Sequence, residues 1–560
     1  MTGGIVEIAI VIVIAALLGI LAAILRQPLV LAYLATGAVI GYFGFLNVTD
    51  KEFFRVFSDL GIMFLLFLVG LEINYTSLRL VGKTSLIIGL GQIIFTSLIG
   101  FGIATLLGFE MLPALYIAVA LTFSSTIIVI KILSDKKDLN SLYGKISIGF
   151  LLVQDFVAIL ILIMLAGIQN GGEFHATSLL VTIAEGLGLF LIMLWLGRKI
   201  MPKIFDIIAH SQELLFVASL AWVLFIVAIV SKIGFSIEIG GFLAGLALAN
   251  SSEHFQIANR IKSLRDFFIL IFFVILGSSL ALANFGGLST TIIILSVFVL
   301  IGNPLIVMIL MGIMGYRART SFFAGVTVAQ ISEFSLILAA LGLKTGHIRE
   351  SDAAVITAVG IITITLSSYL MIHAERIFHA FKKYLSFFER KHHAREQSFA
   401  SSPKSIVLIG FHRTGASIAS ELPKDDLLVV DFDPNIIHAL QKHSIAHVFG
   451  DMNDTSILDE SKIKKAKLII STNPELDDNI MLLSYLGATR KRLNTIIVRA
   501  RTDNEARILY QKGADYVIIP HFTTGQYIGK IIAQGFKKSA FRALQKKDIS
   551  LLERRDSLLS

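Results

Sequence analysis

The chain has 560 residues, of which 55% are hydrophobic and only 16% charged, and its formal net charge is +9. Soluble proteins average about 25% charged residues, but the first 400 residues here hold only 48 charged residues, whereas the last 160 hold 41. This distribution excludes a soluble enzyme, a secreted protein or a disordered protein for the first 400 residues, and it indicates an integral membrane protein with a soluble C-terminal part. Because the chain has no cysteine, a disulfide framework, a thiolate zinc site and a redox thiol are also excluded.

Thirteen segments are candidates to span a membrane, since a span needs about 20 mostly apolar residues. The first begins at Ile5 with no basic segment before it, which favours a retained span over a signal peptide. The candidates lie near residues 5–25, 28–46, 54–72, 84–107, 113–133, 142–167, 177–200, 213–231, 234–250, 265–283, 288–314, 320–343 and 351–374.

Basic residues in the connections predict the orientation of these spans. Alternate connections form two sets, which carry fifteen and five Lys and Arg residues respectively. The richer set is expected in the cytoplasm. For an odd number of spans this places the N-terminus outside and the C-terminal part inside, in agreement with the charged composition of that part.

Asp155 is the most prominent polar residue at membrane depth, where an ionised carboxylate costs about 2.5–3.5 kcal/mol. It follows Gln154 and lies 14 residues into a segment that starts near Ser141, about 21 Å along a helix. We interpret Asp155 as a carboxylate that binds a proton and a monovalent cation, K⁺ or Na⁺, in turn. The alternative is a buried acid that only helps helices to pack.

Two further polar stretches lie inside predicted spans, at Ser124-Ser125-Thr126 and at Gln330-Ile331-Ser332-Glu333. Ser and Thr side chains satisfy backbone groups that an interrupted helix leaves free. Two interrupted spans in corresponding places are typical of transporters built from inverted repeats. We therefore predict an all-α polytopic membrane domain with broken helices. The alternative for the hydroxyls is that they only help helices to pack. The alternative for Glu333 is that it only forms a hydrogen bond to a neighbouring helix.

The last 160 residues alternate between short apolar runs and helical lengths, which predicts a parallel, doubly wound α/β domain. The domains are expected at 1–381 (membrane), 382–404 (linker), 405–520 (Rossmann-like) and 521–560 (helical tail). The expected strands are 405–410, 427–431, 446–451, 466–472, 495–499 and 516–520.

The turn after the first of these strands predicts a nucleotide site. It runs Gly410-Phe411-His412-Arg413-Thr414-Gly415 and matches G-x-G-x-x-G except for His412 at the middle glycine, which a pyrophosphate needs for close approach. Asp431 ends the second strand, where an acid binds a ribose hydroxyl. We expect Gly410, His412, Arg413, Thr414, Gly415, Asp431, Asp451 and Thr472 to bind an adenine nucleotide, with AMP, ADP or ATP favoured over NAD(H) and a scaffold without ligand as the alternative.

Several of these motifs together resemble the Kef-type branch of the cation:proton antiporter-2 family. They are Ser124-Ser125-Thr126, Gln154-Asp155, Gly240-Gly-Phe-Leu-Ala-Gly245, Phe272-Phe-Val-Ile-Leu-Gly277 and Gln330-Ile-Ser-Glu-Phe334. The C-terminal part is similar to the regulator-of-potassium-conductance domain that follows the membrane domain in that branch. The resemblance implies a homodimer and elevator-like movement of a core domain, and its Gln-Asp pair points to potassium.

The chain departs from the family at two places. Many members carry a lysine where Asn303 stands here, and the loop that is acidic in glutathione-gated members corresponds to the basic stretch 254–262. Gating by glutathione is therefore not expected. Without a lysine at Asn303, that position offers a neutral oxygen to a cation.

We therefore predict a transporter and not an enzyme: a K⁺ (or Na⁺):proton antiporter of the plasma (inner) membrane of a prokaryote, regulated by an adenine nucleotide. Asp155 is expected to exchange the proton and the cation, with oxygens from Gln154, Ser124, Ser125, Thr126 and Asn303, and with Glu333 nearby. The expected partners are a second copy of the chain, the lipid bilayer and the nucleotide, with no nucleic acid. One alternative is a ligand-gated potassium channel, but the sequence has no carbonyl-filter motif of the TVGYG type. The other alternative is a sensor that binds a nucleotide without transport.

Overall fold

The computed structural model describes residues 3–43, 51–72, 82–136, 138, 139, 141–166, 176–208, 211–233, 235, 237–249, 251, 253–282, 288–388, 403–487, 494–533 and 538–559. The chain forms two compact units. The first comprises Met1–Asp135, Ile146–Leu310 and Phe322–Phe381, and the second comprises Lys136–Lys145, Met311–Ser321 and Lys382–Ser560.

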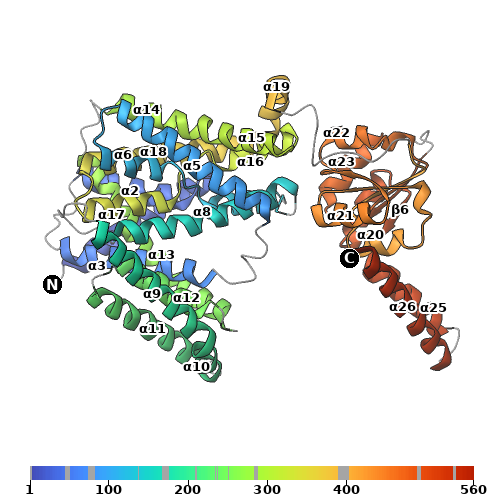
Figure 1. Ribbon diagram of the computed structural model, residues 1–560, viewed down its shortest axis with the longest axis horizontal. Coiled ribbons are helices and arrows are strands. Elements are labelled where there is room, and N and C mark those ends of the chain that lie inside the picture. The colour runs from blue at the N-terminus through green and yellow to red at the C-terminus, as the bar shows by residue number, and fades with distance from the viewer. Residues whose placement is uncertain are drawn as a thin grey trace. The chain divides into compact units, whose positions relative to one another are not determined.

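All regular secondary structure among the described residues of the first unit is helix, and every segment predicted to span the membrane contains helix (Figure 1). The all-α prediction for this part is confirmed. Its helices, some of which begin or end within the second unit, are α1 (Gly3–Ile24), α2 (Leu29–Phe43), α3 (Lys51–Glu72), α5 (Lys83–Leu106), α6 (Met111–Ala120), α7 (Thr126–Asp135), α8 (Leu142–Ala166), α9 (Ala176–Lys199), α10 (Met201–Ile208), α11 (Gln212–Ile233), α12 (Ile237–Leu248), α13 (His254–Leu282), α14 (Ser289–Val297), α15 (Asn303–Ile313), α16 (Ala318–Thr327), α17 (Glu333–Lys344), α18 (Glu350–Ile372) and α19 (Ala374–Leu385).

Two of the predicted spans are interrupted, as expected. The span at 113–133 consists of α6 and α7 with a break at residues 121–125, and the span at 320–343 consists of α16 and α17 with a break at 328–332. A third irregularity was not predicted: the π-helix η2 (Phe298–Gly302) joins α14 to α15. π-Helical turns occur frequently at functional sites, and this one ends immediately before Asn303.

The helices of the first unit pack as two groups. The frame group contains α1, α2, α3 and α9 to α13, in which α2 and α3 pack against α13, and α3, α9 and α11 pack against α12. The core group contains α5 to α8 and α14 to α18, in which α18 packs against α14, α17, α6 and α7. Hydrogen bonds join α8 to α5 and α15 to α5 within the core group.

Glycines let the backbones of the frame group approach closely. A Cβ atom at Gly245 of α12 would lie 2.0 Å from the carbonyl oxygen of Phe67 in α3, and one at Gly277 of α13 would lie 2.1 Å from that of Leu34 in α2. Both separations are far below van der Waals contact, so only glycine fits. Small residues at such crossings are typical of helix association in membranes, where van der Waals packing replaces the hydrophobic effect.

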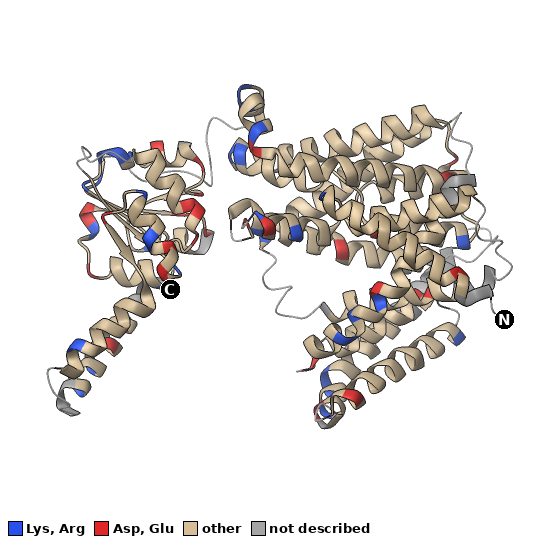
Figure 2. Ribbon diagram, turned by 180° about the vertical axis from the view of Figure 1, so that it is seen from behind, with Lys and Arg blue, Asp and Glu red and all other residues tan. Residues whose placement is uncertain are grey.

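Charged side chains are sparse along the long helices of the first unit and gather near helix ends (Figure 2). Among the described residues, six helices are long and apolar enough to cross a membrane by themselves, and α2, α3, α6 and α12 contain shorter apolar stretches. This distribution agrees with a multi-pass membrane domain.

The structure corrects two boundaries. The basic stretch 254–262, expected as a loop, forms the first turns of α13, because Ile257 and Ile261 recur at helical spacing and are both buried. The linker expected at 382–404 begins inside a helix, since α19 continues to Leu385 and a 3₁₀ turn, η3, covers Ser386–Phe388. Residues 389–402 of that expected linker lie outside the described residues.

The second unit is built on a six-stranded parallel sheet, which confirms the doubly wound prediction. The strands lie in the order β3-β2-β1-β4-β5-β6, the order of dinucleotide-binding folds. Apolar residues of β1, β2 and β4 are almost completely buried, as expected for central parallel strands covered on both faces. The strands are β1 (Ile406–Ile409), β2 (Leu427–Asp431), β3 (Ala446–Phe449), β4 (Leu468–Ser471), β5 (Thr495–Arg499) and β6 (Tyr516–Ile518).

Helices cover this sheet and extend beyond it. Helices α25 and α26 form the helical C-terminal tail that was expected at 521–560. The helices of this part are α20 (Arg413–Ala419), α21 (Pro434–Lys442), α22 (Thr455–Glu460), α23 (Leu476–Leu486), α24 (Asp503–Gln511), α25 (Pro520–Ala533) and α26 (Lys538–Leu559).

Two short segments from the membrane part of the sequence belong to the same compact unit, at 136–145 and 311–321. Arg317 forms an ion pair with Glu460 of α22, and the ring of Tyr316 lies 6.5 Å from that of Phe449 at the end of β3. Both Arg317 and Tyr316 are buried. The α/β domain therefore includes residues that lie far from it in the sequence.

Candidate ion site and nucleotide site

The two helix breaks lie against each other in the core group. The Ser124 hydroxyl donates to the carbonyl oxygen of Val328 at 3.4 Å, and the Ser335 hydroxyl donates to that of Ala120 at 2.6 Å. Ser332 caps α17 by accepting from the backbone N–H of Phe334 at 3.2 Å. Hydroxyl side chains thus satisfy backbone groups that the interrupted helices leave free, as the sequence predicted.

Two carboxylates meet consecutive hydroxyls where the first break ends, at Ser125 and at Thr126, the first residue of α7. Thr126 donates to Oδ2 of Asp155 at 2.8 Å, and Ser125 donates to Oε2 of Glu333 at 3.5 Å. Asp155 comes from α8, and Glu333 is the first residue of α17. Three separate segments of the chain therefore bring these four predicted residues together, although Asp155 and Glu333 are 178 positions apart in the sequence.

Gln154 is fully buried and both ends of its amide are occupied. Its Oε1 accepts from the backbone N–H of Ser124 at 3.2 Å, and its Nε2 donates to Oε1 of Gln92 at 2.7 Å. The Nε2 atom of Gln92 in turn donates to Thr96 Oγ1 and to the carbonyl oxygen of Thr122, both at 3.1 Å. In this arrangement Gln154 holds the first break in place.

Asn303 also supports the first break. Its Nδ2 donates to the carbonyl oxygen of Leu121 at 2.9 Å, and its Oδ1 accepts from the Thr96 hydroxyl at 3.1 Å. A continuous buried chain of hydrogen bonds thus runs from Gln154 through Gln92 and Thr96 to Asn303. We call these four residues the amide network.

Sequence reasoning missed Gln92 and Thr96. Both are fully buried in α5, inside an otherwise apolar span. A polar amide at membrane depth with a threonine four residues later was the available signal, because residues at that spacing lie on one face of a helix.

This arrangement is suited to binding a proton or a small monovalent cation. Carboxylate and hydroxyl oxygens replace part of the hydration shell of an alkali cation, and a carboxylate can carry a proton in its place. The surrounding apolar helices make an uncompensated charge costly. Occupation by one positive species at a time therefore has a physical basis.

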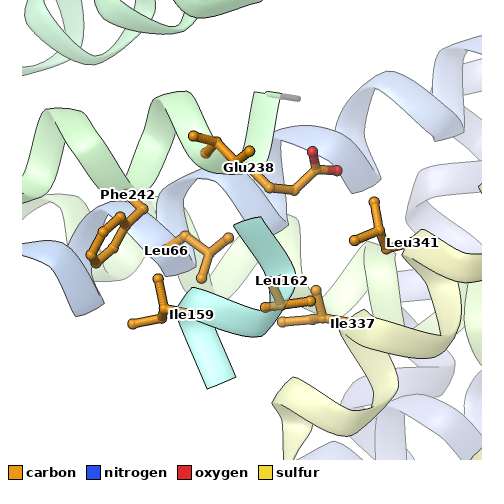
Figure 3. Close-up of a pocket in the computed structure, with 8 residues that line it drawn as sticks. Leu66, Ile159, Leu162, Glu238, Phe242, Ile337 and Leu341 are labelled. Atoms are coloured by element: carbon orange, nitrogen blue, oxygen red, sulfur yellow. The ribbon is translucent and has the colours of Figure 1, made fainter. Parts of the chain in front are cut away.

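A small apolar cavity lies where the two helix groups meet (Figure 3). Its volume of about 10 Å³ is at the lower limit of what a cavity needs to hold one water molecule. Residues of α3, α8, α12 and α17 line it: Leu66, Ile159, Leu162, Glu238, Ile239, Phe242, Ile337 and Leu341. Figure 3 shows the carboxylate of Glu238 directed toward the side where Leu341 lies.

Glu238 belongs to an ion cluster that joins the two groups. Lys344, at the end of α17, lies 3.4 Å from Glu238 Oε1 and 3.1 Å from Asp59 Oδ1 of α3. Glu238 is only 6% exposed, and its Oε2 has no hydrogen-bond partner among the described residues. One cation of the core group is thus held by two acids of the frame group.

The second unit contains a cavity of about 520 Å³ at the carboxyl ends of its strands, within the range of small-ligand pockets. Seven of the eight residues predicted to bind a nucleotide line it: Gly410, His412, Arg413, Thr414, Asp431, Asp451 and Thr472. Residues that the sequence analysis did not single out also line it, among them Asp138, Ser141, Lys145, Asn473, Asp478 and Arg499.

The glycine turn has the backbone that its sequence predicts. Gly410 adopts a φ of +84°, which favours glycine. Gly415 is not among the lining residues, but a Cβ atom there would lie 1.9 Å from the Gly410 carbonyl oxygen, so its role is to let the turn close. His412 and Arg413 are both exposed, which leaves their side chains available to an anionic ligand.

Asp431 uses both carboxylate oxygens locally. Oδ2 accepts from the backbone N–H of Phe411 at 2.6 Å, and Oδ1 accepts from that of Asp433 at 2.8 Å. Burial raises the pKa of Asp431, and these two N–H groups act in the opposite direction. Burial also raises the pKa of Asp478, against the lowering effect of its amide neighbours Asn453 and Asn473. The cavity therefore combines buried acids with exposed cationic side chains.

Comparison with known proteins agrees with the division of the chain into a membrane part and an α/β domain. The family model "Sodium/hydrogen exchanger, transmembrane" matches residues 11–372, and the model "TrkA-N domain" matches residues 406–520. The "Putative cation/proton antiporter YbaL" of Escherichia coli (strain K12) is 26% identical over 527 residues, which cover 90% of this chain and 93% of that protein. The structure of the sodium proton antiporter MjNhaP1 from Methanocaldococcus jannaschii has a TM-score of 0.51 at 18% identity, covering 68% of this chain and 97% of that one.

Broken helices around half-buried carboxylates, followed by a parallel α/β domain, define a multi-pass membrane antiporter with a C-terminal TrkA-N domain. The chain belongs to the sodium/hydrogen exchanger family, and it is a cation/proton antiporter. The resemblance to the cation:proton antiporter-2 family with a C-terminal TrkA-N domain is thereby confirmed.

Proposed function

We propose that this antiporter exchanges K⁺, in preference to Na⁺, for protons at Asp155. The observation that carries the proposal is the Thr126 hydroxyl 2.8 Å from the Asp155 carboxylate, at the break of an interrupted helix. When the cation leaves, a proton takes its place on Asp155, so the two compete for one site. Glu333 provides a second carboxylate near the same break.

The preference for K⁺ rests on the neutral partner of the acid. Gln154 carries no charge, and its amide is held by Ser124 and Gln92. Position 154 therefore adds no negative charge beside Asp155, where a second adjacent acid would add one. A weaker field is suited to the larger, more easily dehydrated alkali cation.

For alternating access we propose that the core group moves relative to the frame group. The close glycine crossings between α12 and α3 and between α13 and α2 support a rigid frame. The cavity between the groups is small and lined almost entirely by apolar side chains, so sliding there exposes little polar surface. The Lys344 cluster must rearrange in that movement.

We further propose that an adenine nucleotide binds the cavity of the second unit and regulates exchange. A mononucleotide (AMP, ADP or ATP) is favoured over NAD(H), because His412 stands where dinucleotide sites have a glycine. Arg413 and His412 would bind its phosphate by charge-assisted hydrogen bonds. The assembly is proposed to be a homodimer in a prokaryotic plasma membrane, with its N-terminus outside and its C-terminal domain in the cytoplasm.

Exchange is tested with purified protein in proteoliposomes, by following proton movement after addition of K⁺ or Na⁺. Asp155→Asn keeps the shape of the side chain and removes a charge from the membrane interior, so it is expected to fold and to lose exchange. Asp206→Asn, at an exposed position of α10, is the matched control and should exchange normally. Cation-dependent proton flux retained by Asp155→Asn would refute the assignment, and stronger exchange with Na⁺ would refute the K⁺ preference.

Nucleotide binding is tested by titrating the full-length protein in detergent with ATP, AMP and NADH. Arg413→Gln is expected to weaken mononucleotide binding about tenfold, the effect of losing one charge-assisted hydrogen bond. Arg507→Gln, exposed on α24 and away from the cavity, is the control. If NADH binds much more tightly than the mononucleotides, the inference from His412 is wrong.

A further inference from the structure

The nucleotide cavity has a wall that does not come from the TrkA-N domain. Asp138, Ser141 and Lys145 line it together with the residues of the α/β domain. All three belong to the segment Lys136–Lys145, which lies in the same compact unit as that domain. This segment leads directly into α8, the helix that carries Gln154 and Asp155.

Asp451 connects this wall to the α/β domain. Its Oδ2 accepts the backbone N–H of Leu142 at 3.2 Å, and its Oδ1 accepts the backbone N–H of Asn453 at 2.9 Å. Leu142 is the first residue of α8, and the first N–H groups of a helix have no partner within the helix. A carboxylate of the nucleotide cavity therefore caps the helix that carries the ion site.

Lys145, in the first turn of α8, belongs to the same wall. Its Nζ lies 4.7 Å from the centre of the Phe432 ring, and Phe432 directly follows Asp431 at the end of β2. Lys145 is exposed to the cavity. A ligand bound beside Asp431 would thus meet a cation and an aromatic ring supplied by two different parts of the chain.

The chemistry of this wall suits the nucleoside part of a nucleotide. An ionised carboxylate accepts about four hydrogen bonds, and Asp451 receives two from the backbone, so it can accept further donors such as an amino or hydroxyl group. The acids Asp138 and Asp478 also line the cavity and repel a phosphate. The phosphate is instead expected at His412 and Arg413 on the glycine turn.

We propose that Asp138, Ser141 and Lys145 form part of the nucleotide site, and that a bound nucleotide fixes the start of α8 and thereby acts on the ion site. This inference rests on the nucleotide binding proposed above. Helix α8 runs unbroken from Leu142 to Ala166, and Asp155 lies about 20 Å along it at 1.5 Å per residue. A continuous helix transmits a displacement of its first turn to Asp155 without any intermediate element.

The coupling has to be reciprocal. If nucleotide binding changes the affinity of the ion site for K⁺ by some factor, K⁺ changes the affinity for nucleotide by the same factor. Couplings between sites are usually about 5–150-fold. The nucleotide affinity of the full-length protein is therefore expected to differ at least about fivefold between saturating K⁺ and a K⁺-free buffer with an organic cation.

Hydrogen–deuterium exchange of the full-length protein in detergent tests the wall directly, with ATP and AMP as probes. Nucleotide is expected to slow exchange both in residues 428–453 and in residues 138–146, where the Leu142 N–H depends on Asp451 for its protection. Lys145→Gln should weaken nucleotide binding about tenfold. Lys203→Gln, an exposed lysine on α10, should leave it unchanged.

The outcomes separate this inference from the nucleotide proposal. Protection of 428–453 alone, with the same affinity in K⁺-free buffer and in Lys145→Gln, would overturn the role of α8 and leave nucleotide binding intact. Protection of both segments together with a K⁺-dependent affinity would support it. If no nucleotide binds, both proposals fall.

Discussion

Replacing Gln92 by leucine tests whether the amide network holds the ion site in shape. The substitution removes three hydrogen bonds: from Gln154 Nε2 at 2.7 Å, to Thr96 Oγ1 at 3.1 Å and to the Thr122 carbonyl oxygen at 3.1 Å. Leucine has a similar volume, so the change removes polar contacts without leaving a large cavity.

The size of the effect follows from the groups left without this partner. A buried polar group that loses its hydrogen bond costs about 1–3 kcal/mol, and two such groups remain here, the Gln154 amide nitrogen and the Thr122 carbonyl. In membrane proteins the average bond between helices contributes only about 0.6 kcal/mol, because the unfolded helices find other partners. Since Gln154 and Gln92 are both fully buried, we expect the free energy of unfolding to fall by about 2 kcal/mol or more, nearer the larger of these two estimates.

Two measurements check this prediction. Thermal unfolding in detergent should show the loss of stability, and exchange in proteoliposomes should fall at least about tenfold, because small displacements of reacting groups have large effects. Thr105→Val is the matched control, since Thr105 lies on the same helix but is exposed and bonds only to Phe101 and Gly102 of its own turn.

A double substitution separates stability from activity. In Gln92→Leu combined with Gln154→Leu, both partners become apolar, so stability should recover in part, while exchange should stay low because the Ser124 N–H has lost its acceptor. Native exchange in the Gln92→Leu protein, or strictly additive losses of stability in the double variant, would contradict the structural role of the network.

Two further predictions concern the outer parts of the membrane unit. Lys344→Gln removes the cation shared by Glu238 and Asp59 and leaves a buried acid uncompensated. The free energy of unfolding, measured by thermal unfolding, should therefore fall by about 1–3 kcal/mol. Unchanged stability together with an unchanged exchange rate would show that the ion cluster is not needed. Burial lowers the pKa of His347 from its ordinary value of 6.5. The stability that the neutral imidazole contributes is therefore present above that pH and lost as the pH falls below it. Melting temperatures measured at about pH 7.5 and about pH 5 should differ less in His347→Gln than in the unchanged protein, and an equal difference would refute His347 as the source of the pH dependence.

The interrupted helices could be predicted because polar residues are costly at membrane depth and therefore conspicuous. The hydroxyls at 124–126 and Glu333 stand out in apolar segments, and both helix breaks were found at those places. The strands of the second unit were predictable for a related reason, since short buried runs between turns have few alternative structures.

Other features depend on contacts that no local pattern contains. Gln92 is a single polar residue, and its importance comes from Gln154, 62 positions away. Lys145 is interpretable from sequence only as a loop charge, because its place in the nucleotide cavity requires the distant residue Phe432. The start of α13 was missed because its basic residues hid the helical spacing of Ile257 and Ile261.

The glycine crossings of the frame group have a consequence for how this protein can be studied. Where a Cβ atom would lie 2.0 Å from a carbonyl oxygen, no side chain, spectroscopic label or crosslinker can be introduced without separating α12 from α3. Labels that report on movement therefore belong on the lipid-facing residues of α11 and α5, such as Phe225 and Phe95, which are 59% and 49% exposed. A pair of labels there follows one helix of each group and leaves the packing between them undisturbed.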